Sequence, residues 1–353
     1  MSASPGADPQ RRRADLRRRL IGLAERFAGR RVAVIGDVIA DEFLYGSPAR
    51  ISREAPVLIL EHDRTVVVPG GAGNAAANAG ALGGEVRFVG LVGPDDAELM
   101  DGLRGRVDAS RVLRPAGYRA PVKTRVLAGG LHTARQQIVR IDRGPAGDPG
   151  AAAADFERAG LDALDGCDAA LVSDYGSGLV TPELFARLRE RLAPDGGRSA
   201  APLLVDSRHA LADFRGCTAC TPNQAEAEQV LGVPIGDDPE RLERAGRELL
   251  RRTGAGGVVV TRGSRGMAVF VPGRPTDHVP IFGSDEVADV TGAGDTVIAT
   301  LTLALAAGAS LCEGARLANY AGGLVVMKRG TATVTAGELI RAIRTDFDRG
   351  GED

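Results

Sequence analysis

The stretch RVAVIGD at residues 31–37 decides how the rest of the chain can be interpreted. Its run of valine, alanine and isoleucine predicts a strand buried on both faces, because helix-covered parallel strands lose the alternation of apolar and polar residues. The helix-like stretch GNAAANAGALGG follows at 73–84, and a second buried strand, EVRFVGLVG, follows at 85–93. A strand, a helix and a strand in this order predict parallel strands joined by a crossover helix.

The same alternation continues through most of the chain. Strand-like stretches occur at 168–176, 202–207, 216–223 and 256–263, and helical patterns occur at 181–192, from about Asn223, and at about 239–252. After residue 289 the chain is almost wholly helical in pattern. We therefore predict an α/β fold with a doubly wound, mostly parallel sheet flanked by helices.

Two segments interrupt this rhythm. Residues 56–68 and 121–142 are each strand-like and contain no helical pattern, and the second resembles a hairpin around Gly129 and Gly130. We expect a small β-sheet lid formed by about 42–68 and 119–143. We also expect the Arg-rich residues 1–18 to be a disordered tail and residues 19–353 to form the main domain.

Composition limits the classes of function. The chain has 44 basic and 46 acidic side chains, so it has no overall field for nucleic acid or an anionic membrane. No apolar run is long enough to span a bilayer. Four scattered cysteines predict no disulfide framework, which fits a reducing cytoplasm.

Cysteine and histidine patterns predict no redox or metal centre. Cys217 and Cys220 form a C-x-x-C on a predicted strand, where residues three apart point to opposite faces. The four histidines have no partner at i+3 or i+4 and predict no metal site; they are His62, His132, His209 and His278.

The stretch DVTGAGDT at residues 289–296 predicts the reactive centre. Gly292, Ala293 and Gly294 can turn backbone N–H groups toward an anion where a helix begins, and Asp295 can accept the proton of an attacking hydroxyl. The competing explanation is that Asp289 and Asp295 are only acids favoured at a helix start. A Walker P-loop and a dinucleotide fingerprint are both excluded, because neither pattern occurs in the chain.

Three further fragments carry polar side chains at strand or helix ends. Gly70, Gly71 and Asn74 form a strand-to-helix turn that can approach a polyhydroxylated ligand. Asp37 and Asp41 lie beyond the carboxyl end of the first strand, where open α/β sheets bind ligands. Asn223 and Glu226 start a helix three residues apart and could organise Mg²⁺, although each fragment alone is more often a cap or a turn.

Together, the early GGAGN and late DVTGAGD stretches resemble the two signatures of the ribokinase-like (PfkB-type) carbohydrate kinases over roughly residues 30–345. Within that family, the chain is most similar to the kinases of D-glycero-D-manno-heptose 7-phosphate. The stretches that carry this likeness are GDVIADEFLYG (36–46), RISREAPV (50–57), QQIVRID (136–142), SDYGSG (173–178) and VVMKRGT (325–331).

The resemblance implies an ATP- and Mg²⁺-dependent kinase that phosphorylates the C1 hydroxyl of heptose 7-phosphate in nucleotide-activated heptose biosynthesis. It implies a homodimer formed through the lid. Because the sequence stops at Asp353, we expect any nucleotidyltransferase activity to come from a separate protein. The resemblance assigns Asp295 as base; Gly292, Ala293 and Gly294 as anion hole; Asn223 and Glu226 to Mg²⁺ and phosphates; Thr261, Gly263, Gly266 and Asn319 to the nucleotide; Asp289 to a monovalent cation such as K⁺; and Asp37, Asp41, Gly70, Gly71, Asn74 and Asp174 to the sugar.

Two positions depart from the heptose kinase pattern. Ser177 stands where a lysine is typical, and Asp206-Ser207-Arg208 replaces Asp-Pro-Lys. A phosphorylated sugar needs cations, so another sugar or sugar-phosphate kinase, or a catalytically silent sugar- or nucleotide-binding relative, stays an alternative. The candidate cations are Lys123, Arg125, Arg140, Arg208, Arg50 and Arg53.

Overall fold

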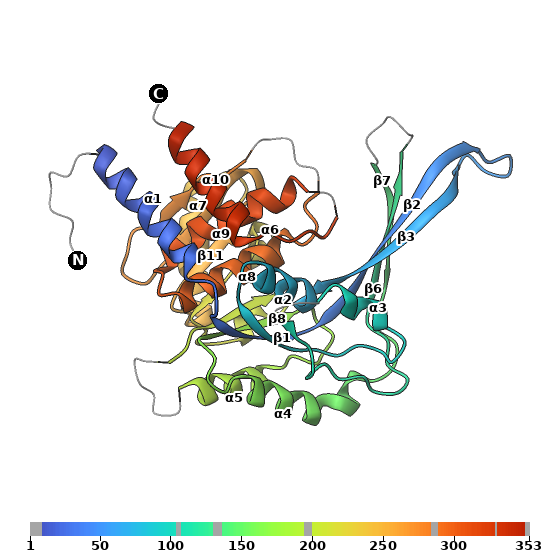
Figure 1. The fold of residues 1–353 in the computed structure, drawn as a ribbon, viewed down its shortest axis with the longest axis horizontal. Coiled ribbons are helices and arrows are strands. Elements are labelled where there is room, and N and C mark those ends of the chain that lie inside the picture. The colour runs from blue at the N-terminus through green and yellow to red at the C-terminus, as the bar shows by residue number, and fades with distance from the viewer. Residues whose placement is uncertain are drawn as a thin grey trace.

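The computed structural model describes residues 9–103, 107–129, 136–193, 200–283, 289–328 and 330–349. Its centre is a nine-stranded sheet in the order β13-β12-β11-β10-β9-β8-β1-β4-β5 (Figure 1). The strands from β11 to β5 pair in parallel, and β12 and β13 add an antiparallel edge. The bounds are β1 (Arg31–Gly36), β4 (Glu85–Val89), β5 (Val107–Asp108), β8 (Ala169–Asp174), β9 (Leu203–Ser207), β10 (Ala219–Cys220), β11 (Val258–Thr261), β12 (Met267–Phe270) and β13 (Asp277–Val279).

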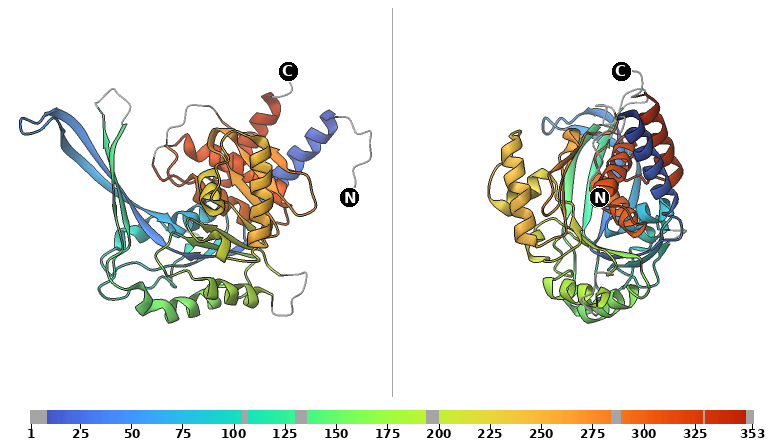
Figure 2. Two further views of the ribbon diagram at one scale, coloured as in Figure 1. Left: turned by 180° about the vertical axis from the view of Figure 1, so that it is seen from behind. Right: turned by 90° about the vertical axis from the view of Figure 1, so that its left-hand side faces the viewer.

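Helices cover both faces of this sheet, which confirms the predicted fold class (Figure 2). Strand β1 is apolar throughout because both of its faces are buried. Val32 and Val34 belong to one hydrophobic core, whereas Ala33 and Ile35 belong to the other. The first core includes residues of α1 (Pro9–Glu25), α2 (Ala72–Ala81), α8 (Ala293–Ala306), α9 (Leu311–Val326) and α10 (Ala336–Arg349). The second includes residues of α4 (Ala153–Ala163), α5 (Pro182–Leu192), α6 (Gln224–Leu231) and α7 (Pro239–Thr253); the short α3 (Ala97–Asp101) follows β4.

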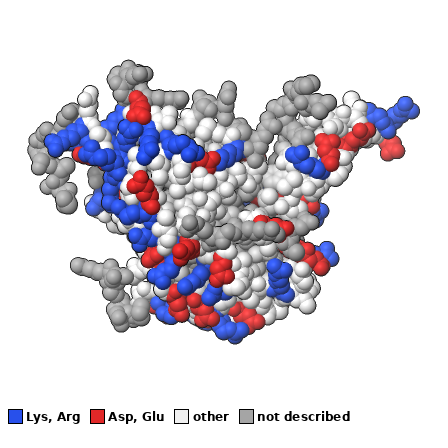
Figure 3. Space-filling model, in the orientation of Figure 1, with Lys and Arg blue, Asp and Glu red and all other residues white. Residues whose placement is uncertain are grey.

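Helix α1 corrects the prediction of a disordered tail, which was wrong from Pro9 onward. Leu20 and Leu23 are fully buried in the first core, so one stripe of this Arg-rich segment is apolar. Arginines on its other sides pair with acids of the C-terminal helices, as Arg17 does with Asp348 at 2.9 Å. In Figure 3, Lys and Arg side chains gather over this part of the molecule. Residues 1–8 lie outside the described residues.

A second sheet of four strands contains the two segments that interrupt the α/β rhythm. Its order is β3-β2-β6-β7, with β2 parallel to β6 and the other pairs antiparallel. Only Asp37 separates β1 from β2, so the second sheet grows directly out of the main one and projects from the body (Figure 1). The predicted Gly129–Gly130 turn between β6 and β7 falls partly on residues 130–135, which lie outside the described residues together with His132. The bounds are β2 (Val38–Ile51), β3 (Leu58–Gly71), β6 (Val122–Ala128) and β7 (Gln136–Arg143).

The C-x-x-C pair corrects a second expectation. The Cys220 thiol interacts with the Cys217 thiol, and this contact together with burial raises the pKa of Cys220. The prediction of opposite faces was wrong because β10 begins only at Ala219, so Cys217 precedes the strand. Both cysteines are buried and free.

Within the described ranges, no helix has the length and apolar character that crossing a membrane requires.

Candidate active site

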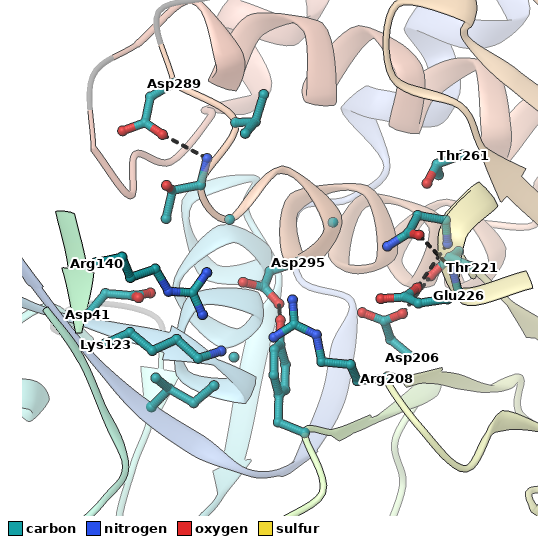
Figure 4. Close-up of a pocket in the computed structure, with 18 of the residues that line it drawn as sticks. Asp41, Lys123, Arg140, Asp206, Arg208, Thr221, Glu226, Thr261, Asp289 and Asp295 are labelled. Carbon is teal, nitrogen blue, oxygen red and sulfur yellow. Dashed lines mark hydrogen bonds between the residues drawn. The ribbon is translucent and has the colours of Figure 1, made fainter. Parts of the chain in front are cut away.

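A cavity of about 500 Å³ lies where the carboxyl ends of the main-sheet strands face the second sheet (Figure 4). Parallel strands all end on the same edge, which explains why residues distant in sequence meet here. In Figure 4, Lys123 and Arg140 reach toward Asp295 from one side, and Asp206 and Glu226 lie on the other. The predicted residues that line it are Asp41, Gly71, Lys123, Arg125, Arg140, Asp174, Arg208, Asn223, Glu226, Thr261, Asp289, Gly292, Gly294 and Asp295.

Asp295 is the most deeply buried acid of this cavity, with 3% of its surface exposed. It is the third residue of α8, and its two oxygens accept hydrogen bonds from different elements. The Tyr175 hydroxyl donates to Oδ1 at 2.9 Å, and the Asn74 amide donates to Oδ2 at 2.8 Å. Burial raises the pKa of Asp295 to about 6, against the lowering effect of these two bonds. A carboxylate with this pKa is suited to accept a proton near neutral pH.

The start of α8 needs a glycine at its cap. Gly292 has a left-handed φ of 76°, and a Cβ there would lie 2.3 Å from the Asn74 amide nitrogen. Gly294 in the first turn is exposed to the cavity, where helix N–H groups have no intrahelical partner. Ala293 does not line the cavity, and its N–H donates to the Val290 carbonyl at 3.3 Å.

Asn74 touches Asp295 rather than the cavity. It is buried on α2, and Asn78 one turn later donates to its side-chain oxygen at 3.0 Å. This bond orients the Asn74 amide so that its NH₂ group faces Asp295. Gly70 also lies outside the lining, where a Cβ would come within 2.2 Å of the Asp41 carboxylate.

The second sheet supplies cations. Arg125 pairs with Asp41 at 2.6 Å, and both side chains are about nine-tenths buried. Arg140 makes two bonds to Asp142 on the exposed strand β7. Lys123 reaches inward, and burial together with nearby Arg208 lowers the pKa of its ammonium group. Arg50, near the far end of β2, and Arg53, just beyond that strand, do not line the cavity.

Asp37, which was predicted to bind the sugar, does not line the cavity. It is buried and accepts the backbone N–H groups of Tyr175 at 2.8 Å and Ser177 at 3.2 Å, together with the Ser177 hydroxyl. Burial raises the pKa of Asp37. Ser177, the residue in place of the typical lysine, therefore fixes the loop that carries Tyr175. Asp174 does line the cavity and accepts the Ser207 hydroxyl at 2.6 Å.

On the opposite side, Asn223 and Glu226 form a reciprocal capping box at the start of α6, with both bonds at 2.9 Å. The cap accounts for their residue types, but both also face the cavity beside Asp206. Burial and the neighbouring Glu226 raise the pKa of Asp206 well above its usual value. Two acids that disfavour each other's charge suit a cation, and Mg²⁺ typically takes one or two carboxylates and completes its shell with waters and phosphates. Among the described residues no group of three acids, histidines or cysteines could hold a metal alone.

The residues predicted to bind the nucleotide lie in two different places. Thr261 lines the cavity, and Gly263 and Gly266 form the turn that follows it. Gly266 has a φ of 73°, and a Cβ there would lie 2.0 Å from the Val279 carbonyl oxygen, so both the backbone conformation and the close approach favour glycine. Asn319 lies elsewhere: it donates to the Pro280 carbonyl at 2.8 Å and lines a separate hollow of about 240 Å³.

Asp289 has a structural role in the loop before α8. Its carboxylate accepts the N–H groups of Thr291 at 2.9 Å and Gly330 at 3.2 Å, which ties that loop to the segment after α9. The monovalent cation stays a prediction.

Four residues that were not predicted as site residues also line the cavity: Tyr175, Asp206, Thr221 and Gln137. A signal existed for Asp206, which directly follows the buried run LLV of β9, as Asp37 follows β1. Applied to every strand, the rule on carboxyl ends would have found it. Tyr175 follows β8 in the same way, although an aromatic residue there is a weaker signal.

Comparison with known proteins identifies the family of the chain. The family model described as pfkB family carbohydrate kinase matches residues 30–336. The chain is 41% identical over 328 residues to the bifunctional protein HldE of Caulobacter vibrioides, covering 91% of this chain and 65% of that protein. It is 41% identical over 324 residues to HldE of Geobacter sulfurreducens, covering 88% and 62%. The chain thus spans less than two thirds of the length of these relatives.

Solved structures share the fold. The ribokinase of Arabidopsis thaliana, complexed with ribose and ATP, has a TM-score of 0.68 at 18% identity and covers 90% of this chain and 99% of its own. Phosphofructokinase-2 of Escherichia coli, in complex with potassium, has a TM-score of 0.71 at 19% identity with the same coverage. On the family match, which covers most of its length, the chain belongs to the pfkB family of carbohydrate kinases.

Proposed function

We propose that the chain transfers the γ-phosphoryl group of ATP to the C1 hydroxyl of D-glycero-D-manno-heptose 7-phosphate, giving the 1,7-bisphosphate, in nucleotide-activated heptose biosynthesis. The observation that carries this proposal is the buried Asp295 carboxylate at the start of α8, facing a cavity lined by basic side chains. The likeness to HldE proteins over 91% of the chain supports the choice of a heptose substrate.

Asp295 accepts the proton of the attacking C1 hydroxyl as the new O–P bond forms, while the bond from the γ-phosphorus to the β,γ-bridging oxygen breaks and ADP leaves. Backbone N–H groups in the first turn of α8 face the charge on the transferring phosphoryl group, because helix starts favour anions. Lys123, Arg140 and Arg208 line the same cavity and would hold the phosphate that the sugar already carries. No covalent intermediate is needed, since catalysis of this transfer consists of positioning and charge stabilisation.

Asp206 and Glu226, with Asn223, are the residues that would hold Mg²⁺ and its waters on the nucleotide side. When bound, the ion neutralises charge on the phosphates of ATP. Thr261 and the turn that follows it lie on the same side and would border the nucleotide.

An ADP-release assay across four acceptors tests the substrate: heptose 7-phosphate, fructose 6-phosphate, ribose and fructose. We expect the highest kcat/KM with heptose 7-phosphate, and ³¹P NMR of the product should show a second phosphate at C1. A preference for fructose 6-phosphate would favour a hexose phosphate kinase, for which the serine at 177 is the motivating departure. A preference for either free sugar would overturn the phosphorylated-substrate assignment.

We also propose that a second copy of the chain covers the second sheet. This sheet projects from the body (Figure 1) and exposes apolar side chains, of which Ile51 is 69% and Ile138 is 49% exposed. Exposed apolar surface of this kind marks association sites. Light scattering after gel filtration should give twice the chain mass, and Ile138→Lys should shift the mass toward one chain. A wild-type protein of single-chain mass at micromolar concentration would contradict the proposal.

A further inference from the structure

Tyr175 contacts more functional groups of the cavity than its sequence position suggested. Its backbone N–H donates to Asp37, at the joint between the two sheets, at 2.8 Å. Its hydroxyl donates to Asp295 at 2.9 Å. Its ring lies 4.8 Å from the Lys123 ammonium and 5.5 Å from the centre of the Arg208 guanidinium. One side chain thus touches the base and both cations.

The ring contacts matter because these two cations have no carboxylate partner in an ion pair among the described residues. Arg125 and Arg140 each have a carboxylate partner, whereas neither Lys123 nor Arg208 forms an ion pair with any described residue. Cations within about 6 Å of a ring centroid are attracted by the ring's quadrupole. The Tyr175 ring therefore holds two positive charges beside the base without neutralising them, which leaves both charges available to an anionic substrate.

The hydroxyl contact completes the support of Asp295. Asn74, which bonds the other carboxylate oxygen, is oriented by Asn78 at 3.0 Å. Each oxygen therefore has one fixed donor, and a carboxylate oxygen has a further lone pair for a substrate hydroxyl. Burial and nearby Asp295 raise the pKa of Tyr175 well above its usual value, so the phenol stays protonated and always donates.

Charged groups on both sides also act on Asp295. Asp41 and Lys123 face it from the second sheet, with opposite effects on its protonation. Asp206, on the main sheet, faces Asp295 from the proposed nucleotide side, and Arg208 lies between these two acids (Figure 4). The phenol, like the Asn74 amide, is a neutral donor, so removing its hydroxyl changes one hydrogen bond and no charge.

We infer that Tyr175 is a positioning residue for phosphoryl transfer, whose hydroxyl orients the Asp295 carboxylate and whose ring seats Lys123 and Arg208 for the anionic group of the sugar substrate. The inference rests on the proposed role of Asp295 as base. It adds two separable functions of one side chain, and conservative substitutions can divide them.

Tyr175→Phe removes the hydroxyl and keeps the ring. Because the lost bond favours the ionised carboxylate, the acid limb of the kcat/KM–pH profile should move up by about one pH unit, a tenfold change in protonation. At pH 6 kcat/KM should fall about fivefold, approaching tenfold at pH 5, with a smaller loss at pH 8.5. The KM for the sugar phosphate should change less than about twofold, since Lys123 and Arg208 keep their contacts with the ring.

Tyr175→Leu also removes the ring, and the KM for the sugar phosphate should then rise about tenfold or more. The KM for ATP, measured in the same preparations, reports whether the nucleotide side is intact. Tyr320→Phe is the matched control, because its hydroxyl also donates to an aspartate, Asp346, outside the cavity. This control should leave the pH profile unchanged.

The inference is overturned if Tyr175→Phe has the wild-type acid limb, or if it raises the sugar KM as much as Tyr175→Leu. These results differ from a failure of the proposed base. If Asp295→Asn is inactive while Tyr175→Phe behaves like wild type, only the positioning role fails. If Asp295→Asn turns over normally, the assignment of the base fails first.

Discussion

Two carboxylates stand at the third position of a helix in the same cavity, and they are held in different ways. Glu226, in α6, accepts the backbone N–H of its own cap residue, Asn223, at 2.9 Å. Asp295, in α8, follows a cap glycine with no side chain, and its donors are Asn74 and Tyr175. These donors are 221 and 120 residues away in the sequence.

The difference separates a local cap from a tertiary site. Both acids sit where the helix dipole favours negative charge, so helix-start preference alone explains the choice of either residue. A capping box needs only four consecutive residues. The support of Asp295 needs α2, the end of β8 and the start of α8 in one place, and it exists only in the folded protein.

The largest expected effect is on the acid held by distant donors. Asp295→Asn should lower kcat by about 10³-fold or more, because general-base catalysis contributes about 10² to 10⁴ and the amide cannot accept the proton. The KM for ATP should stay within about threefold of wild type, since Asp206 and Glu226 are unchanged. Steady-state ADP release measures both, and a variant with more than a tenth of wild-type kcat would break the distinction.

Glu226→Gln sharpens the other half of the comparison. Glutamine can still accept the Asn223 N–H, so the cap and the melting temperature should be nearly unchanged. Losing the charge should lower kcat about 10- to 100-fold at limiting Mg²⁺, with partial recovery at high Mg²⁺, because a carboxylate ligand is gone.

Glu313→Gln is the matched control for that variant. Glu313 has the same capping-box position in α9 and does not line the cavity. Its substitution should alter neither kcat nor the Mg²⁺ dependence. If Glu226→Gln matches this control, Glu226 is only a cap.

The smallest effect is on stability, and its sign is opposite to the effect on activity. The folded-state pKa of Asp295 is about 6, above the unfolded value of about 3.9, so the folded chain holds an extra proton between these values. The free energy of unfolding therefore falls as pH rises from about 4 to 6. Asp295→Asn should be more stable than wild type by about 2–3 kcal/mol at pH 7.5, and by less than about 1 kcal/mol at pH 4.

Urea unfolding at both pH values measures that difference. An Asp295→Asn protein that is equally stable or less stable at pH 7.5 would mean that the carboxylate bears no burial penalty.

Much of the fold followed from the sequence because local patterns carry it. The apolar run of β1 and the alternation after it predict a helix-covered parallel sheet, and that architecture is confirmed. The error at α1 arose because six arginines dominate the composition of residues 11–19, while burial depends on the spacing of leucines such as Leu20 and Leu23. The error at Cys217 and Cys220 arose from extending a two-residue strand by three residues at each end.

The site was less predictable, for a physical reason. Residue types at a helix start predicted where Asp295 and Glu226 lie, but not which of them has distant partners. Tyr175 and Asn74 reach Asp295 only through the packing of α2 and β8 against α8. Asp37 and Asn319 have suitable chemistry, yet backbone N–H groups and a carbonyl inside the fold take up their polar atoms. A sequence motif cannot show whether a polar side chain bonds to groups inside the fold or faces the cavity.

The most direct test of Asp295 as a buried base supported by distant donors is the pH dependence of kcat/KM with heptose 7-phosphate from pH 4.5 to 9. We predict an acid limb with a midpoint near 6 and a tenfold fall per pH unit below it, which follows from the raised pKa of Asp295. The residual activity of Asp295→Asn should lack this limb. A wild-type profile that is flat down to pH 5, or a limb of the same midpoint in Asp295→Asn, would contradict the account.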